Sequence, residues 1–288
     1  MLHNGAVLPD PSQLATLLAI VEEGSFEAAA RRLHLTPSAV SQRIRALEAS
    51  AGRVLVRRTA PASVTEEGQG HLRLARRFHL LEMEFDAAGR ESAAATLRIA
   101  VNADSLAIWF GAVLAQAAED GQIAVQVFVE DQAYGRELLR RGEVVAAVTS
   151  HHETVQGCSV EPLGTMRYVA AAARGLVDRR GADLAALPLV VFNEKDHLQD
   201  GLLERAGLAR PPIVHRVPSS HEFAEAVRCG LGWGMVPQTQ LSDDLVPLRG
   251  GAYVDIPLFW HRWRLELAAL DRLSGWVRGA AAVALRQR

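Results

Sequence analysis

Apolar residues recur every three or four positions through much of the first 90 residues, which is the spacing of one face of an α-helix. Three successive helices are predicted on this basis, with apolar faces that consist of Leu14, Leu17, Leu18 and Val21, then Phe26, Ala29, Ala30 and Leu33, then Val40, Ile44 and Leu47. Asp10 and Thr36 can cap the first and third helices, Ser25 opens the second, and Gly24 ends the first. The close succession of helix, short helix, tight turn and helix predicts a helix-turn-helix.

The polar side of the third predicted helix suits the major groove of DNA. This side carries Ser38, Ser41, Gln42 and Arg45. Hydroxyl and amide groups hydrogen-bond base edges, and guanidinium groups bind guanine or phosphate. An ordinary solvated helix face is the alternative for this stretch taken alone, and the residues on either side of it weigh against that alternative.

A short β-rich stretch after Gly52 is predicted to form a wing. Its two candidate strands, 54–56 and 63–64, flank a turn that contains Pro61. Between residues 37 and 58 the net charge is +4 (5 − 1), because Glu48 is the only acid beside five arginines, namely Arg43, Arg45, Arg53, Arg57 and Arg58. We expect Arg53, Arg57 and Arg58 on the phosphate backbone, and the wing arginines over phosphates or in the minor groove.

A long helix is predicted from Gly70 to Ala88, after a helix-start pattern at residues 65–68. Its apolar stripe, which includes Leu72 and Leu80, is widened by Phe78 and is larger than its own domain requires. A partner helix is therefore favoured, which predicts a homodimer or a dimer of dimers, and packing against its own domain is the alternative.

The residues of this region, taken together, resemble a known family. The set comprises Gly24-Ser25-Phe26, Ala28-Ala29-Ala30, Leu33, Pro37 to Ser41, Ile44, Leu47-Glu48, Gly52, Leu55, Arg57, Thr65 and Gly68. It resembles the N-terminal domain of LysR-type transcriptional regulators over about the first 90 residues. The resemblance implies a winged helix-turn-helix that binds double-stranded operator DNA, with RNA polymerase as a partner at the promoter. Many members carry Gln42 and Arg43 in the opposite order, which leaves the base preference at these positions open.

From residue 92 onward, a small polar linker gives way to alternating strand and helix patterns. The predicted strands cover 97–101, 123–129, 144–148, 166–173, 189–192, 213–217 and 233–236, and the predicted helices cover 106–118, 134–141, 181–186, 198–206, 221–229 and 271–285. Such alternation predicts parallel sheets with helices on both faces, arranged as two subdomains, and the last helix is expected to return to the first subdomain. Such a pair usually binds a small molecule in the crevice between its members.

This part of the chain resembles the effector domain of LysR-type regulators, which is similar to periplasmic binding proteins. Segments that more narrowly resemble the ArgP/LysG branch are Val101 to Ser105 with Trp109-Phe110, Leu163 to Tyr168, Phe192-Asn193 with Asp196 and Leu198-Gln199, and Ala226 to Met235. The branch resemblance implies lysine or arginine as the effector, and control of an amino acid exporter or a metabolic gene.

The patterns and the resemblance together predict an α/β protein overall, with three successive parts. These are a winged helix-turn-helix DNA-binding domain at 1–64, a linker and dimerisation helix at 65–91, and an effector-binding domain at 92–288. Within the effector-binding domain, subdomain I is expected at about 92–163 and 268–288, and subdomain II at about 164–267.

Two junctions between a predicted strand and a predicted helix, at residues 102–105 and at Ser219-Ser220, carry groups that can bind an amino acid. The backbone N–H groups of residues 102–105 and the Ser105 hydroxyl can hold a carboxylate, and a cationic group needs acids nearby. The candidate effector-binding residues are Asn102, Asp104, Ser105, Glu130, Thr149, Asn193, Asp196, Ser219 and Ser220, with Asp131 as a further acid. For each acid or serine alone, a helix cap or a surface position is the alternative.

The sequence contains no motif that indicates an enzyme or a metal-binding protein. The chain has no P-loop and no Gly-x-Ser-x-Gly motif, and the glycines at 230–234 lack the dinucleotide-binding spacing, so neither an enzyme nor a cofactor is expected. His151-His152 has no supporting ligand pattern for a metal, and the two cysteines are expected to be reduced. A net charge of −2 does not distinguish a DNA-binding protein.

The sequence has neither a signal-peptide pattern nor an apolar run long enough for a membrane span, which predicts a cytoplasmic protein with no membrane partner. Two alternatives to a lysine- or arginine-responsive regulator stay open. One is a regulator of the same family with a different small-molecule effector. The other is an effector-independent protein that binds the nucleoid or a replication origin.

Overall fold

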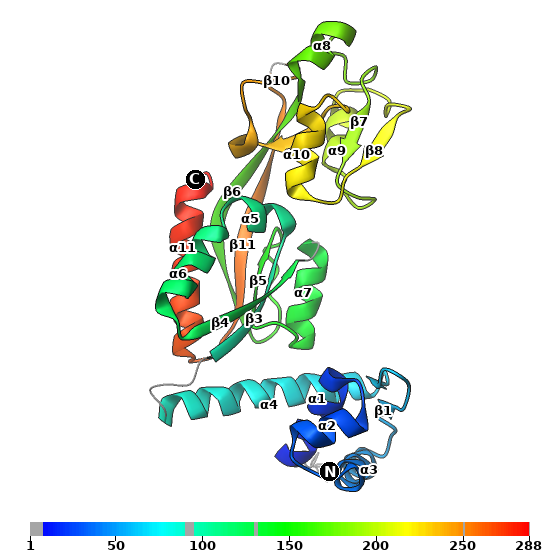
Figure 1. Cartoon of the computed structure of the whole chain (residues 1–288), viewed down its shortest axis with the longest axis vertical. Coiled ribbons are helices and arrows are strands. Elements are labelled where there is room, and N and C mark those ends of the chain that lie inside the picture. The colour runs from blue at the N-terminus through cyan, green and yellow to red at the C-terminus, as the bar shows by residue number, and fades with distance from the viewer. Residues whose placement is uncertain (1–7, 90–94, 130–131, 250, 288) are drawn as a thin grey trace, which may run out of the picture.

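The computed structural model of the chain describes residues 8–89, 95–129, 132–249 and 251–287. These residues form three parts along one long axis, namely an N-terminal helical domain, a middle lobe and an upper lobe (Figure 1). The mixed α/β architecture with an N-terminal helix-turn-helix is the one that the sequence predicts.

The N-terminal domain consists of three short helices, a two-stranded wing and a long fourth helix. Their bounds are α1 Pro11–Glu23, α2 Phe26–Arg32, α3 Pro37–Ala51, β1 Val56–Arg57, β2 Ser63–Val64 and α4 Gly68–Gly89. The side chains of Asp10, Ser25 and Thr36 accept hydrogen bonds from backbone N–H groups in the first turns of α1, α2 and α3. Because these caps satisfy otherwise unpaired donors, they fix where each helix starts.

The apolar stripe of α3 faces the core of this domain, as its spacing predicts. Val40, Ile44 and Leu47 are buried in one core cluster together with Leu17 and Ile20 of α1. Burial of this stripe sets the rotation of α3 about its own axis, since turning the helix would expose all three side chains to water. The opposite side of α3 is consequently left in solvent.

Glu48 connects α3 to the wing, a role that the sequence does not indicate. Its Oε1 atom accepts hydrogen bonds from the backbone N–H groups of Leu55 (2.9 Å) and Val56 (3.2 Å). The only acid in the basic stretch therefore satisfies backbone donors at the start of the wing, which positions β1 relative to α3.

The two lobes contain the remaining elements. The middle lobe comprises β3 Ala95–Val101, α5 Ala103–Ile108, α6 Gly111–Asp120, β4 Ile123–Val129, α7 Gln132–Arg141, β5 Ala146–Thr149 and α11 Ala268–Ala284. The upper lobe comprises α8 Arg174–Arg180, β7 Leu189–Val191, α9 Leu198–Arg205, β8 Val214–Arg216, α10 Ser220–Arg228, β9 Gly234–Pro237, a 3₁₀ turn Gln238–Gln240 and β10 Leu245–Pro247. Two long strands, β6 Cys158–Ala173 and β11 Tyr253–Trp263, run through both lobes (Figure 1).

The main sheet is mixed rather than parallel, which corrects the prediction of wholly parallel sheets. Its strand order is β10-β6-β11-β5-β3-β4, with β9 also paired to β6. The pairs β3–β4, β3–β5 and β7–β8 are parallel as expected, but β6 and β11 pair in antiparallel fashion along most of their length. Prolines and charged residues interrupt the apolar pattern of β11 and of the first half of β6, so only the second half of β6 is predicted from the sequence.

Two predicted helices differ from the structure. Residues 181–186 are not helical, and the helix lies just before them as α8, which Gly181 ends with a φ of 80°. The apolar spacing of the 181–186 stretch instead reflects Leu184, which is buried in the core. The helix predicted over 106–118 is divided into α5 and α6 at Trp109 and Phe110, which are both buried.

The last helix returns to the middle lobe, as predicted. It packs beside α6 and against β6 and β3. The indole N–H of the fully buried Trp260 in β11 donates to the Ser274 hydroxyl of α11 over 3.0 Å. This bond satisfies a buried polar donor and connects the helix to one of the strands that cross between the lobes.

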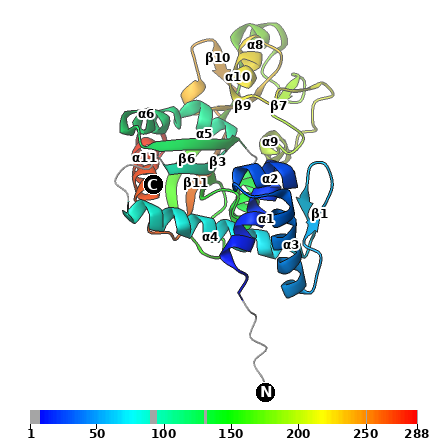
Figure 2. The same cartoon turned by 60° about the horizontal axis from the view of Figure 1, so that its bottom comes forward.

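The helix α4 passes beneath the middle lobe, with α1, α2 and α3 gathered at one of its ends (Figure 2). The Arg76 guanidinium donates to the backbone carbonyl of Arg141 (3.0 Å) and pairs with Glu143 (3.3 Å). Arg77 lies over the ring of Trp263, with 4.4 Å between its Cζ atom and the ring centroid. Part of α4 thus packs against the middle lobe, and its buried Leu72 and Ala75 join the core of its own domain, which was the alternative to a partner helix.

Candidate functional site

The polar side of α3 is open to solvent. Ser38, Gln42 and Arg45 are exposed, and Ser41 and Arg43 are half-buried. In the part of the chain that the structure describes, none of the five side chains makes a hydrogen bond or an ion pair within the protein. Their donors and acceptors are therefore available to an external partner along one helical face.

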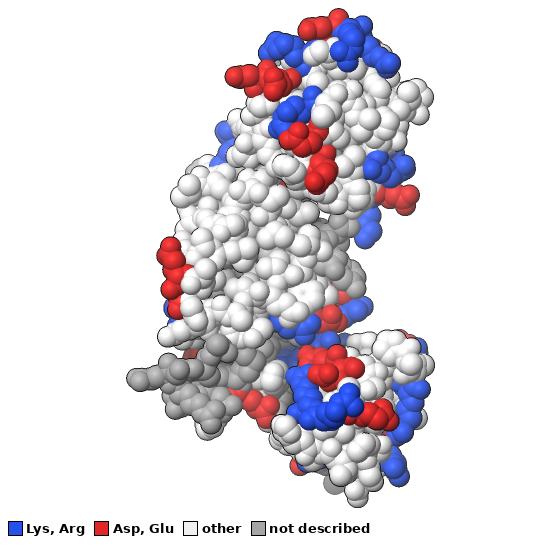
Figure 3. Space-filling model, in the orientation of Figure 1, with Lys and Arg blue, Asp and Glu red and all other residues white. Residues whose placement is uncertain are grey.

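The basic residues of the wing lie beside α3. Arg53, Arg57 and Arg58 are all exposed, and the Cζ atom of Arg58 lies 4.5 Å from the ring centroid of Phe26. This cation–π contact orients one guanidinium group without neutralising it. Figure 3 shows basic side chains gathered on the N-terminal domain, with acids among them, whereas the visible face of the middle lobe is largely uncharged.

The far part of α4 exposes large apolar side chains. Leu81 is 52% exposed and Phe85 is 81% exposed, whereas Leu72 and Leu80 are buried. Leu81 and Phe85 are four positions apart and share one helical face, and exposed apolar side chains of this size are typical of a surface that a second chain covers. Leu72 lies in the core of the N-terminal domain and Leu80 in the core of the middle lobe, so the buried residues of α4 pack within this chain.

Several predicted effector-binding residues lie where the two lobes meet. Asn102 and Ser105 follow β3, and Thr149 ends β5, at the same edge of the sheet because these strands are parallel neighbours. All three side chains are buried. The Thr149 hydroxyl hydrogen-bonds the backbone of His151, whereas the Asn102 Oδ1 and Ser105 Oγ atoms have no hydrogen-bond partner in the described structure.

Asp104 joins the two lobes. Its Oδ2 atom accepts a hydrogen bond from the Tyr168 hydroxyl (2.6 Å), and its Oδ1 atom accepts one from the Ser220 hydroxyl. Tyr168 lies on β6, which crosses between the lobes, and Ser220 begins α10 of the upper lobe. We call Asp104, Tyr168 and Ser220, together with the buried Asn102 and Ser105, the interlobe site.

Tyr168 is a member of this site that the sequence analysis did not select. It is buried, and burial together with the nearby carboxylate of Asp104 raises its pKa well above the ordinary value, so that the phenol stays a hydrogen-bond donor. Asp196 also contributes to this rise in the pKa of Tyr168. Residues 168–173 of β6 are all buried, so the signal that the sequence offers is a phenol within an otherwise apolar strand segment.

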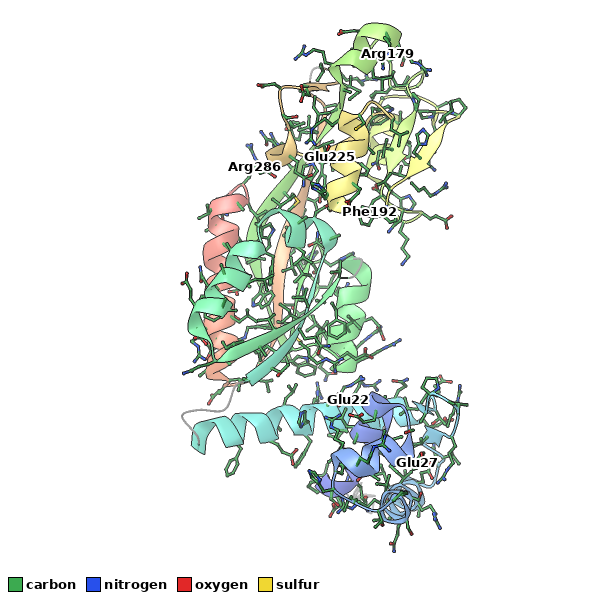
Figure 4. All side chains as sticks on the ribbon, in the orientation of Figure 1. Glu22, Glu27, Arg179, Phe192, Glu225 and Arg286 are labelled. Atoms are coloured by element: carbon green, nitrogen blue, oxygen red, sulfur yellow. The ribbon has the colours of Figure 1, made fainter. Side chains whose placement is uncertain are left out.

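The remaining predicted residues of the upper lobe are engaged locally. Asp196 accepts hydrogen bonds from the backbone N–H groups of Phe192 (2.8 Å) and Leu198 (3.2 Å), in a loop that faces the middle lobe (Figure 4). Asn193 accepts one from the backbone N–H of Lys195, and the Ser219 hydroxyl donates to Glu222. Glu130, with its neighbour Asp131, lies outside the described residues.

No metal site emerges from the described ranges, in which no group of three or more His, Cys, Asp or Glu side chains is arranged to hold an ion. His151 and His152 precede β6, and the backbone carbonyl of His151 accepts a hydrogen bond from buried His261 over 2.7 Å.

Cys158 is buried, which raises the pKa of its thiol to about 11, and both cysteines are free thiols. None of the described helices is long and apolar enough to span a membrane.

Comparison with known families decides the broad class. Residues 11–69 match the family of bacterial regulatory helix-turn-helix proteins of the lysR type, and residues 90–282 match the LysR substrate binding domain. The chain belongs to the LysR family of transcriptional regulators. It is accordingly a regulator and not an enzyme, as the sequence resemblance predicts.

Individual LysR-family relatives place the chain in one branch. It is 45% identical to the lysine export transcriptional regulatory protein LysG of Corynebacterium glutamicum, over 96% of this chain and 99% of the relative. It is 38% identical to the transcriptional regulator ArgP of Pseudomonas aeruginosa, over 90% of this chain and 91% of that one. The predicted membership of the LysG/ArgP branch is confirmed.

Solved structures of LysR-family proteins agree with this placement. Full-length LysG from Corynebacterium glutamicum with bound effector Arg has a TM-score of 0.80 and 44% identity, covering 96% of this chain and all of that one (100%). ArgP from Mycobacterium tuberculosis has a TM-score of 0.87 and 41% identity, covering 98% of this chain and 100% of its own. The fold of the whole chain is therefore that of full-length regulators of this branch.

Proposed function

We propose that this chain is a DNA-binding transcriptional regulator that responds to a basic amino acid, lysine or arginine. The observation that carries the proposal is the match along nearly the whole chain to LysG, whose structure at 44% identity holds Arg as its effector. The interlobe site supports it, because it presents hydroxyl groups, a buried amide and a carboxylate to the junction of the two lobes. These are groups that recognise an amino acid.

This proposal assigns a role to each of the three parts of the chain. Residues 1–64 would form the DNA-binding domain, residues 65–91 the linker and dimerisation helix, and residues 92–288 the effector-binding domain, with subdomain I at about 92–163 and 268–288. The exposed Leu81 and Phe85 would meet a second copy of α4 in a homodimer or in a dimer of dimers. The site of action would be cytoplasmic DNA, with RNA polymerase at the promoter of an exporter or metabolic gene.

In the DNA complex, α3 would enter the major groove. Ser38, Ser41, Gln42, Arg43 and Arg45 would face base edges and nearby phosphates, because burial of the apolar stripe leaves their side of the helix open. The wing would lie on the adjoining backbone, where Arg53, Arg57 and Arg58 contact phosphates.

In the effector-binding domain, the ligand would sit between the lobes. Asn102, Asp104, Ser105 and Thr149 would contact it from the middle lobe, and Asn193, Asp196, Ser219 and Ser220 from the upper lobe. Binding would change the relative orientation of the lobes, because groups from both would contact one ligand. The contacts between α4 and the middle lobe offer a route for such a change to reach the DNA-binding domain, since Arg76 donates to the backbone of Arg141.

The test is thermal unfolding of the purified chain with L-lysine, L-arginine and a panel of unrelated metabolites. A ligand at a thousandfold excess over its Kd stabilises the folded state by about 4 kcal/mol, which raises the melting temperature by several degrees. A rise confined to the basic amino acids supports the proposal. A rise with another metabolite indicates a different effector, and no rise together with weak sequence preference on DNA indicates effector-independent binding.

A further inference from the structure

We propose that Asp104 selects cationic effectors, because its carboxylate pairs with the side-chain ammonium or guanidinium group of the bound amino acid. This inference rests on the proposed function and assigns the charge selectivity of the interlobe site to one residue. Asp104, Glu130, Asp131 and Asp196 are all candidates from the sequence, and the structure describes two of them, Asp104 and Asp196.

Asp104 carries a negative charge that the described protein does not neutralise. Both of its hydrogen-bond donors, the hydroxyl groups of Tyr168 and Ser220, are neutral. No Lys, Arg or His among the described residues forms an ion pair with it, although the carboxylate is half-buried. A carboxylate that is partly removed from water and lacks a cation gains more from a cationic ligand than a fully solvated one does.

The partners of Asp104 also show that it belongs to a site and not to a local turn. The donors lie 64 and 116 positions away in the sequence, one on the strand that crosses between the lobes and one at the start of α10. A carboxylate that only caps a helix bonds to backbone groups within a few residues, and Asp104 makes no such bond in the described structure. Its position at the contact between the lobes is therefore specified by the tertiary fold.

Asp196 has the opposite character. Its Oδ2 atom accepts from the Phe192 backbone N–H and from the Gln199 side-chain amide (3.1 Å), and its Oδ1 atom accepts from the Leu198 backbone N–H. All of these donors lie within four residues of it, so Asp196 shapes its own loop. Its carboxylate adds negative potential near Tyr168, but its oxygens are already committed.

The neutral hydroxyl donors of Tyr168 and Ser220 leave the Asp104 carboxylate able to pair with the cationic group of a ligand. Because the pKa of Tyr168 is raised, its phenol holds its proton and leaves the charge on Asp104. A hydroxyl group that donates to Asp104 can turn its hydrogen elsewhere when an ammonium or guanidinium group arrives, since a hydroxyl rotates freely and also accepts hydrogen bonds. A built-in Lys or Arg would have competed with the ligand for the same carboxylate.

The experiment measures the binding of two ligand pairs by calorimetry to the full-length chain. L-arginine is compared with L-citrulline, which replaces the guanidinium with a neutral ureido group, and L-lysine is compared with L-norleucine, which lacks the ammonium. In Asp104→Asn, we expect the preference for arginine over citrulline to fall by at least about thirtyfold, because one member of a partly buried charge pair is lost. Asp178→Asn, which removes an exposed carboxylate on α8 of the upper lobe, is the matched control and should leave that preference unchanged.

The outcomes separate the inference from the proposed function. If the unaltered chain binds neither arginine nor lysine, the proposed function fails and the inference fails with it. If the unaltered chain binds arginine but Asp104→Asn keeps the same preference over citrulline, only the inference is overturned. An equal loss of affinity for arginine and citrulline also overturns it, because Asp104 would then hold the part that the two ligands share. Asp104→Glu, which keeps the charge, should retain the preference and covers the case in which Asp104→Asn does not fold.

Discussion

The substitution Gly68→Ala tests how closely α4 must approach the wing. Gly68 is the first residue of α4 and is buried. A Cβ atom at this position would lie 2.2 Å from the backbone oxygen of Leu55 and 3.1 Å from the Cβ atom of Val64. Real Cβ contacts are at least 3.0 Å, so the wing or the helix would have to move by about 0.8 Å (3.0 − 2.2).

The magnitude follows from what holds the Leu55 oxygen in place. This oxygen accepts a hydrogen bond of 2.9 Å from the backbone N–H of Thr65, so a displacement of that size weakens the bond as well as the packing. Overpacking costs about 1–3 kcal/mol, and a lost hydrogen bond costs about 1 kcal/mol more. We expect Gly68→Ala to destabilise the N-terminal domain by roughly 2–4 kcal/mol and to displace the wing from the groove side of α3.

The matched control lies two residues further along the same helix. Gly70 is exposed, and the nearest atom to an added Cβ is the end of the Arg73 side chain at 3.8 Å. Gly70→Ala should therefore stabilise the helix, by up to about 1 kcal/mol, because alanine is the better helix former. The two substitutions add the same methyl group and should have opposite signs.

Amide hydrogen exchange of α3 is the appropriate assay. All five tryptophans lie at position 109 or later, so their fluorescence follows the effector-binding part and provides an internal reference. Exchange of the α3 amides should be at least about thirtyfold faster in Gly68→Ala, while the tryptophan transition stays unchanged. Equal exchange in the Gly68→Ala and Gly70→Ala variants would refute the reasoning, because it would show that the close approach to Leu55 carries no cost.

Three further predictions concern phosphate contacts, base reading and pH. Arg57→Ala should weaken binding to every DNA sequence and reduce the salt slope by about 1.8 for a dimer that loses two phosphate contacts, whereas Arg179→Ala, in the upper lobe, should not. Gln42→Ala should instead alter the preference among sequences, and equal losses on specific and random DNA would argue against base reading. Burial lowers the pKa of His261 from its ordinary 6.5, so the unfolded chain takes up the proton first and wild-type stability should fall as pH drops below about 6.5. His261→Gln should show a flatter dependence in denaturant titrations, and an identical slope would contradict this.

The N-terminal domain shows how far local sequence rules extend. The start of α3 at Pro37, its cap at Thr36 and its buried stripe are all predicted correctly, because helical spacing and capping involve residues within four positions of one another. The exposed side of α3 follows from the same pattern, since burial of one side leaves the other in water. The role of Glu48 at the wing is missed because its partners lie seven and eight residues away, across a turn.

In residues 95–287, local sequence patterns fail to predict one long strand and the partners of two acids. The strand β11 carries Asp255 and Pro257, which argue locally against a strand, and it is stabilised by pairing with β6, about 90 residues earlier. The two candidate acids, Asp104 and Asp196, look alike in the sequence. The structure separates them, because the first bonds to groups from distant elements and the second to its own loop.

The sequence by itself thus determined the family, the helix-turn-helix and its polar face, because these depend on residue type and short-range spacing, and it offered candidates for the effector site that did not include Tyr168. Only the tertiary structure decided which of them meet. The bond between Asp104 and Ser220 spans 116 positions and exists because two strands cross between the lobes and bring α5 and α10 together. Contacts of this kind depend on the packing of whole elements, which no local pattern of residues encodes.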